Sequence, residues 1–257
     1  MIRRLITSFV LGVLMCVFAT TSFAATGGDA QVGPEGPDTL CPYANGVPRC
    51  RAQVVRHIGS YSGVSGTIET AEPVLRENTG SSAVQLAVVG PLGQWIELGW
   101  TKQASHYNCD VFFYFATQEG NGSPMFLGWP VYSGGNRKFR MTIALVDEYW
   151  GWWRVKIVDD STNQLVANWE PITTPSRWNR SGLLQANGEV GRQNINDMGV
   201  SGMLNLKYRT TPGSGWPLWE WAGLGLLDAP YVRTQINGSS SSWQVSGNQG
   251  QPGVYCQ

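Results

Sequence analysis

Two glutamates, Glu97 and Glu189, are the residues of this sequence whose surroundings best suit acid–base chemistry. Glu97 lies in an alternating segment, residues 95–100, that has the pattern of a β-strand with an apolar face opposite the carboxylate. Glu189 is framed by Gly188 and Gly191. Burial raises the pKa of a carboxyl group, and two carboxyl groups that share a site can hold one proton between them. We therefore predict that Glu97 and Glu189 form a catalytic pair across one groove, in which one glutamate activates water and the other polarises a carbonyl.

Other catalytic motifs are missing from the sequence. The segment 59–63 resembles a G-x-S-x-G nucleophile motif, but Tyr61 occupies the position of the nucleophile. The sequence contains no H-E-x-x-H zinc site, no P-loop and no complete G-x-G-x-x-G. His57 and His106 are the two histidines, and we expect structural roles for both. With no C-x-x-C pair either, we expect no metal site and no cofactor.

Tryptophan is abundant, with 12 residues, and these rings can line a groove for sugars or proline rings as well as pack a core. Trp95 and Trp100 bracket Glu97, Asn187 precedes the second glutamate, and Trp152 belongs to a tryptophan-rich segment. We predict that Trp95, Trp100, Trp152 and Asn187 bind substrate. Packing in the core or between sheets is the alternative for the tryptophans.

Composition excludes several classes of partner. Net charge is zero and charged residues make up only 14% of the 257 residues, whereas nucleic-acid-binding surfaces are strongly basic. We therefore expect neither nucleic acid nor a membrane surface as a partner of the mature chain. The expected partner is a peptide or protein substrate, and we expect a monomer.

The N-terminus has the pattern of a secretory signal peptide. A short basic start is followed by an apolar run over residues 5–18, too short to span a bilayer comfortably. Ser22-Phe23-Ala24 then provides small residues for cleavage after Ala24. A lipoprotein site at Cys16 and twin-arginine export through Arg3-Arg4 are less well supported by their neighbours. We predict a secreted, extracellular protein with three parts: a signal peptide (1–24), a flexible cysteine-bearing segment that is a candidate pro-segment (25–58), and a catalytic domain (59–257).

Four cysteines remain after signal cleavage, and an even number in an exported chain indicates two disulfide bonds. Four cysteines allow three pairings. We favour Cys41–Cys50, which closes a short loop, together with Cys109–Cys256, which ties the C-terminus to the body of the protein.

Short alternating or apolar runs, separated by turns rich in Gly, Asn, Ser and Pro, predict an all-β fold. We expect a β-sandwich or jelly roll of two antiparallel sheets, with a substrate groove on the concave face. The expected strands cover residues 61–70, 83–89, 95–100, 110–116, 138–146, 152–158, 164–169 and 200–208. A short helix within residues 177–186 is the one helical candidate.

The order of six motifs resembles the neprosin family of secreted glutamic peptidases. Each motif is weak alone, but together they run in family order over residues 60–235, at segments 61–73, 96–100, 112–117, 151–155, 168–171 and 187–191. The resemblance implies a β-sandwich with a groove, activity favoured at acid pH and cleavage after proline. Carried over motif by motif, it implies Glu97 and Glu189 as the catalytic dyad.

The sequence therefore predicts a secreted glutamic-type endopeptidase. Two alternatives share the fold and the secretion signal. One is a non-catalytic sandwich that binds carbohydrate or cell wall through its tryptophans. The other is a glycoside hydrolase that uses the same two carboxylates, whose separation would distinguish an inverting from a retaining mechanism.

Overall fold

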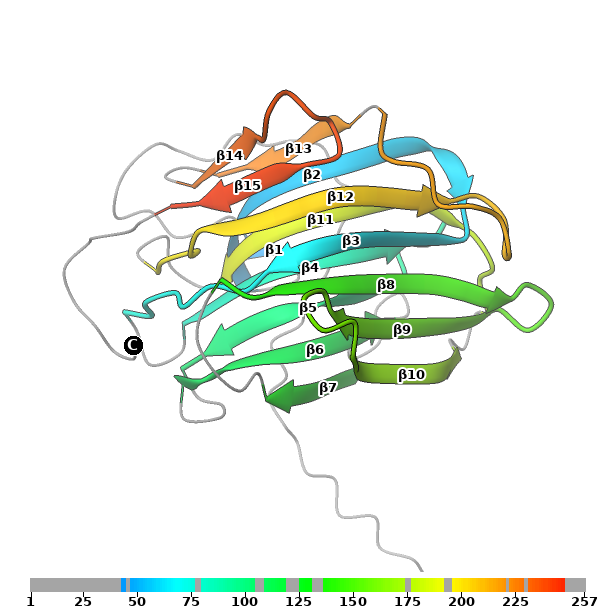
Figure 1. Cartoon of the computed structure of the whole chain (residues 1–257), viewed down its shortest axis with the longest axis horizontal. Helices are drawn as coiled ribbons and strands as arrows, with labels where there is room; N and C mark the ends of the chain where they lie inside the picture. The colour runs from blue at the N-terminus through cyan, green and yellow to red at the C-terminus, as the bar shows by residue number, and fades with distance from the viewer. Residues whose placement is uncertain are drawn as a thin grey trace, which may run out of the picture.

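Two antiparallel β-sheets packed face to face form the protein (Figure 1). The structure is a computed structural model that describes residues 43–44, 47–76, 80–104, 109–118, 125–130, 136–173, 177–191, 196–220, 222–228 and 231–247. The predicted signal peptide, residues 25–42, Cys41, His106 and Cys256 lie outside the described residues. The all-β sandwich predicted from the sequence is confirmed.

The first sheet has eight strands in the order β1-β2-β11-β4-β5-β6-β7, with β13 paired to β2. Its strands are β1 (Tyr43–Ala44), β2 (Val47–Tyr61), β4 (Ser81–Val89), β5 (Trp95–Gln103), β6 (Val111–Gln118), β7 (Met125–Pro130), β11 (Ser181–Gly191) and β13 (Gly223–Leu227). Strands β4 to β7 follow one another as hairpins, whereas β11 arrives from far along the chain and inserts between β2 and β4.

The second sheet has seven strands in the order β10-β9-β8-β3-β12-β15-β14. These are β3 (Gly63–Glu69), β8 (Lys138–Asp147), β9 (Trp152–Asp159), β10 (Leu165–Thr173), β12 (Ser201–Arg209), β14 (Val232–Gln235) and β15 (Trp243–Ser246). Strand β3 follows β2 after a single residue, so the chain crosses from one sheet to the other at that corner.

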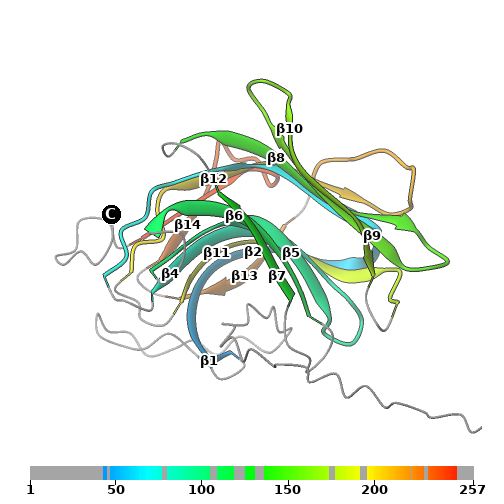
Figure 2. The same ribbon diagram turned by 90° about the horizontal axis from the view of Figure 1, so that it is seen from below.

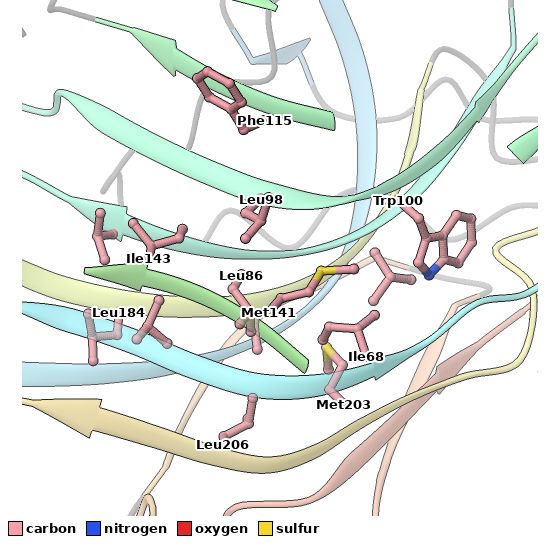
Figure 3. Packing of buried hydrophobic residues seen from close by; sticks show 14 of the residues in the cluster. Ile68, Leu86, Leu98, Trp100, Phe115, Met141, Ile143, Leu184, Met203 and Leu206 are labelled. Carbon is pink, nitrogen blue, oxygen red and sulfur yellow. The ribbon is translucent and has the colours of Figure 1, made fainter. Parts of the chain in front are cut away.

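The main core lies between the two sheets (Figure 3). Every second side chain of a strand points into this core. On β5, the apolar side chains of Ile96, Leu98 and Trp100 point inward and are fully buried, as their spacing predicts. Side chains of the second sheet such as Met141 and Ile143 meet them from the other side. Glu97 therefore lies on the face of β5 that points away from the second sheet.

Two expectations need correction. Residues 47–58, assigned above to an N-terminal segment outside the domain, form most of β2 and pair with β11 along its length. The sandwich therefore begins before residue 59, because β2 supplies an inner strand of the first sheet. Residues 181–186, expected to be part of a short helix, belong to β11 instead. The described residues contain no α-helix, and no helix among them is long and apolar enough to cross a membrane.

Asp159 organises the turn between β9 and β10. Its Oδ1 accepts hydrogen bonds from the Ser161 hydroxyl and backbone N–H and from the Thr162 N–H, and its Oδ2 pairs with Arg137. The Ser161 hydroxyl is the largest influence that holds the pKa of Asp159 far below its ordinary value of 3.8, with Arg137 acting in the same direction against burial.

We expect Asp159→Asn to lower the free energy of unfolding at pH 7 by about 2 kcal/mol, because hydrogen bonds to a charged group are lost. Since the folded-state pKa is depressed, this stabilisation is complete above pH 3.8 and disappears as the pH falls below it. Urea titrations at pH 7 and pH 2 check the prediction. Asp160→Asn, which removes a half-exposed ion pair to Arg140, is the control and should change little. An equal cost of Asp159→Asn at both pH values would contradict it.

Candidate active site

Glu97 lies on the outer face of the eight-stranded sheet, because its neighbours Ile96 and Leu98 point into the core. Figure 2 shows the curve of this sheet. The neighbours of Glu97 across the ladder are Ala87 on β4 and Ala116 on β6. Both alanines are small and are themselves buried, at 0% and 1% exposed. The Glu97 side chain is only 1% exposed, so it lies in a low-dielectric setting in which hydrogen bonds and charges act strongly.

A two-step hydrogen-bond chain orients Glu97. Gln85 Nε2 donates to Glu97 Oε2 at 3.2 Å, and the Tyr114 hydroxyl donates to Gln85 Oε1. Because the phenol occupies the amide oxygen, the amide nitrogen of Gln85 is directed toward Glu97. All three side chains are buried. Tyr114 and Gln85 therefore hold the carboxylate in one orientation, which is what a catalytic group requires.

Glu189 lies on the same face, on β11, and is paired with Arg51 directly across the ladder on β2. Arg51 Nε lies 3.3 Å from Glu189 Oε2, and the two side chains are 4% and 2% exposed. The Arg51 backbone N–H also donates to Asp228 Oδ2 at 2.8 Å, and the Asp228 N–H donates to the Arg51 carbonyl at 2.9 Å. Burial raises the pKa of Asp228, Arg51 opposes that rise and the Glu189 charge adds to it.

The register places the two predicted catalytic glutamates apart along the sheet. Strand β4 separates their strands; Glu97 pairs with Ala87 and Glu189 pairs with Ala83. Two strand spacings of about 4.8 Å and four residues of about 3.4 Å each put their Cα atoms about 17 Å apart. The two side chains share a face, but they do not stand opposite one another in the ladder.

Gln185 is the polar residue of β11 that stands level with Glu97. It pairs with Ala87, which pairs in turn with Glu97, so the two Cα atoms are about 10 Å apart across a methyl side chain. Asn187 Nδ2 donates to Gln185 Oε1 at 3.4 Å. This bond occupies the amide oxygen of Gln185 and leaves its N–H groups to donate elsewhere.

Sequence analysis missed four polar residues of this face: Arg51, Gln85, Tyr114 and Gln185. Their only signal in the sequence is a polar residue at alternate positions of a strand, and that pattern is equally typical of a strand that faces solvent. The structure shows that these side chains are buried. Their proximity to the glutamates depends on strand pairing.

The four predicted substrate-binding residues do not come together. Trp95 and Asn187 lie on the Glu97 face, and Trp95 packs in a small apolar cluster there with Tyr114. Trp100 lies in the core between the sheets, where its Nε1 donates to the Glu69 carbonyl at 2.9 Å. A role in substrate binding does not fit that position. Trp152 lies on the second sheet and is 37% exposed.

Cys50 and Cys109 are both disulfide-bonded. Their pairing with Cys41 and Cys256 stays a prediction, because those two cysteines lie outside the described residues. Within the described part of the chain, no group of three or more His, Cys, Asp or Glu side chains could hold a metal ion.

The comparisons with known proteins relate this chain to others through its fold. No family model matches the sequence, so the resemblance to the neprosin family stays a prediction. No curated protein matches it either. Among solved structures, scytalido-glutamic peptidase with a peptide-based transition-state analogue superposes with a TM-score of 0.53 at 8% identity, over 78% of this chain and 99% of that one. SCP-B, a member of the eqolisin family of peptidases in complex with the tripeptide Ala-Ile-His, gives the same values. The chain therefore has the two-sheet fold found in these glutamic peptidases.

Proposed function

We propose that this protein is a glutamic-type endopeptidase in which Glu97 is the central catalytic carboxylate. The observation that carries the proposal is the polar network on the outer face of the first sheet, where Tyr114 and Gln85 orient a buried Glu97. A buried carboxylate held in one orientation is suited to take a proton from water. The likeness to the fold of glutamic peptidases supports the reaction class.

In the proposed reaction, Glu97 removes a proton from a water molecule that attacks the scissile carbonyl carbon. The oxygen of the resulting tetrahedral intermediate carries negative charge and needs a hydrogen-bond donor. Glu97 then returns the proton to the leaving amine, and the C–N bond breaks.

Two residues are candidates for the oxyanion donor. Glu189 is the partner that the sequence predicts, but it would have to be protonated to donate, and in the structure its carboxylate is paired with Arg51 at 3.3 Å. Gln185 stands level with Glu97 and has its amide oxygen occupied by Asn187, so it presents neutral N–H donors at any pH. If a protonated Glu189 is the donor, the rate of hydrolysis should fall as the pH rises and Glu189 loses its proton. If Gln185 is the donor, the pH dependence of the rate should come from Glu97 alone.

The proposal also covers the pH optimum, the cleavage specificity, secretion and the extent of a pro-segment. We propose an acid optimum and cleavage after proline from the resemblance to the neprosin family. We propose secretion from the pattern of residues 1–24. Any pro-segment must end before Val47, because β2 pairs with β11 and supplies Arg51 to Glu189.

Hydrolysis of a proline-containing peptide library between pH 3 and pH 8, followed by mass spectrometry, tests the proposal. The Glu97→Gln protein, prepared in the same way, excludes a contaminating peptidase. We expect cleavage by the unmodified chain with an acid optimum, and cut sites that follow proline. The absence of cleavage at every pH, from a folded protein whose N-terminal residues up to 40 have been removed, would contradict the proposal.

A further inference from the structure

Strand β9 presents three large side chains in line on the exposed face of the second sheet. The outward side chains are Trp152, Arg154 and Lys156. They alternate with Trp153, Val155 and Ile157, which are buried in the core. Successive outward positions on a strand are about 6.8 Å apart. An aromatic ring and two cations therefore follow one another along the surface, on the sheet that does not carry Glu97.

A polar rung extends this line across three further strands. Lys156 pairs with Thr142 on β8, Thr142 with Ser65 on β3, and Ser65 with Lys207 on β12. The Ser65 and Thr142 hydroxyl groups are 2.9 Å apart and hydrogen-bonded. Three strand spacings put the backbones of Lys156 and Lys207 about 14 Å apart, with hydroxyl groups between them.

Some of the cations on this face have an acidic partner, and others do not. Arg140 pairs with Asp160 at 3.6 Å and Arg154 pairs with Glu170 at 3.3 Å. Lys156 makes no ion pair with any described residue, and the same holds for Lys207. The whole chain has zero net charge, so the local excess on this face attracts anions rather than reflecting a generally basic protein.

The aromatic end of the line is a rigid platform. The rings of Trp150 and Trp152 are nearly parallel, with centroids 6.2 Å apart and an interplanar angle of 22°. They are 41% and 37% exposed, and the Tyr149 ring meets Trp150 edge-on. The backbone N–H of Trp150 donates to Asp147 Oδ1 at 2.9 Å, and the Arg177 guanidinium lies 5.4 Å from the centre of the Trp150 ring. These contacts hold exposed rings in place although burial would be more favourable for them.

We propose that this face binds an acidic polysaccharide, a chain of uronic-acid sugars. The apolar faces of sugar rings stack on Trp150 and Trp152, sugar carboxylates pair with Lys156 and Lys207, and sugar hydroxyls meet the partly buried Thr142. Charge complementarity selects an anionic chain, and the paired tryptophan faces select rings over the flexible side chains of an acidic peptide. The site lies on the other sheet from Glu97, so it serves to anchor the protein to a glycan and does not depend on the proposed peptidase activity.

Titration of the full chain with polygalacturonate, by calorimetry at 20 mM and 500 mM salt, tests the proposal. We expect binding that weakens at high salt, because the charges are exposed and screened. The double substitution Lys156→Gln/Lys207→Gln should weaken binding about tenfold, and Trp152→Ala by a similar factor. Lys156→Arg/Lys207→Arg should retain binding, and so should Leu92→Ala, which alters an exposed apolar residue in a turn of the other sheet.

Three outcomes would overturn the proposal. One is the absence of binding to polygalacturonate by the folded protein at low salt. Another is equally tight binding to poly-L-glutamate, which would identify a general polyanion surface. The third is binding unchanged by the lysine and tryptophan substitutions in proteins whose melting temperatures match that of the unmodified chain.

Discussion

Replacing Glu97 by glutamine is expected to reduce kcat/KM for peptide hydrolysis by about 10³-fold, because an amide cannot accept the proton of the attacking water. The fold should persist. Glutamine has the same shape, and its side-chain oxygen can still accept the hydrogen bond from Gln85 Nε2 that Glu97 Oε2 accepts now. Steady-state kinetics at the optimum pH and a thermal melt of each protein measure the two effects.

Two further variants identify the residue that assists Glu97. If Glu189 is the electrophile, Glu189→Gln should lower kcat strongly and Gln185→Ala should lower it little. If Gln185 supplies the oxyanion donor, Gln185→Ala should cost about 10²-fold, the typical effect of one such donor, and Glu189→Gln should cost less. Turnover by Glu97→Gln close to that of the unmodified protein would refute the proposed catalytic role.

Replacing Arg51 by alanine is expected to lower the free energy of unfolding by about 3–5 kcal/mol. Arg51 and Glu189 are buried together, and removal of the guanidinium takes away the charge that faces the Glu189 carboxylate at 3.3 Å. Urea denaturation at pH 7 measures the loss. The double variant Arg51→Met/Glu189→Gln should recover most of it, because two neutral side chains of similar size replace the pair.

The matched control is Arg180→Ala, which breaks a partly exposed ion pair to Glu148. An exposed pair of this kind contributes less than about 1 kcal/mol. If Arg51→Ala costs no more than Arg180→Ala, the buried pair does not stabilise the fold. If the double variant is no more stable than Arg51→Ala, the loss comes from the packing of the Arg51 side chain and not from the Glu189 charge.

The side chains that share a face of each strand could be predicted from the amino-acid sequence alone. The pleat of a strand is a local property of the backbone, so alternation in residues 95–100 correctly assigns Ile96, Leu98 and Trp100 to the core and Glu97 to the other face. The β4–β5 hairpin was equally accessible, because its turn at residues 90–94 is short and contains Gly90 and Gly93. The all-β class followed from such local patterns, repeated along the chain.

The residues that lie beside Glu97 and Glu189, in contrast, depend on the pairing of distant strands. Strand β11 inserts between β2 and β4, and Arg51 meets Glu189 over a separation of 138 residues. Such a pairing results from the burial of whole sheet faces and the register of distant strands, neither of which a local pattern contains. For that reason the sequence assigned residues 47–58 to a separate segment. It also overlooked Gln185, which strand pairing places level with Glu97.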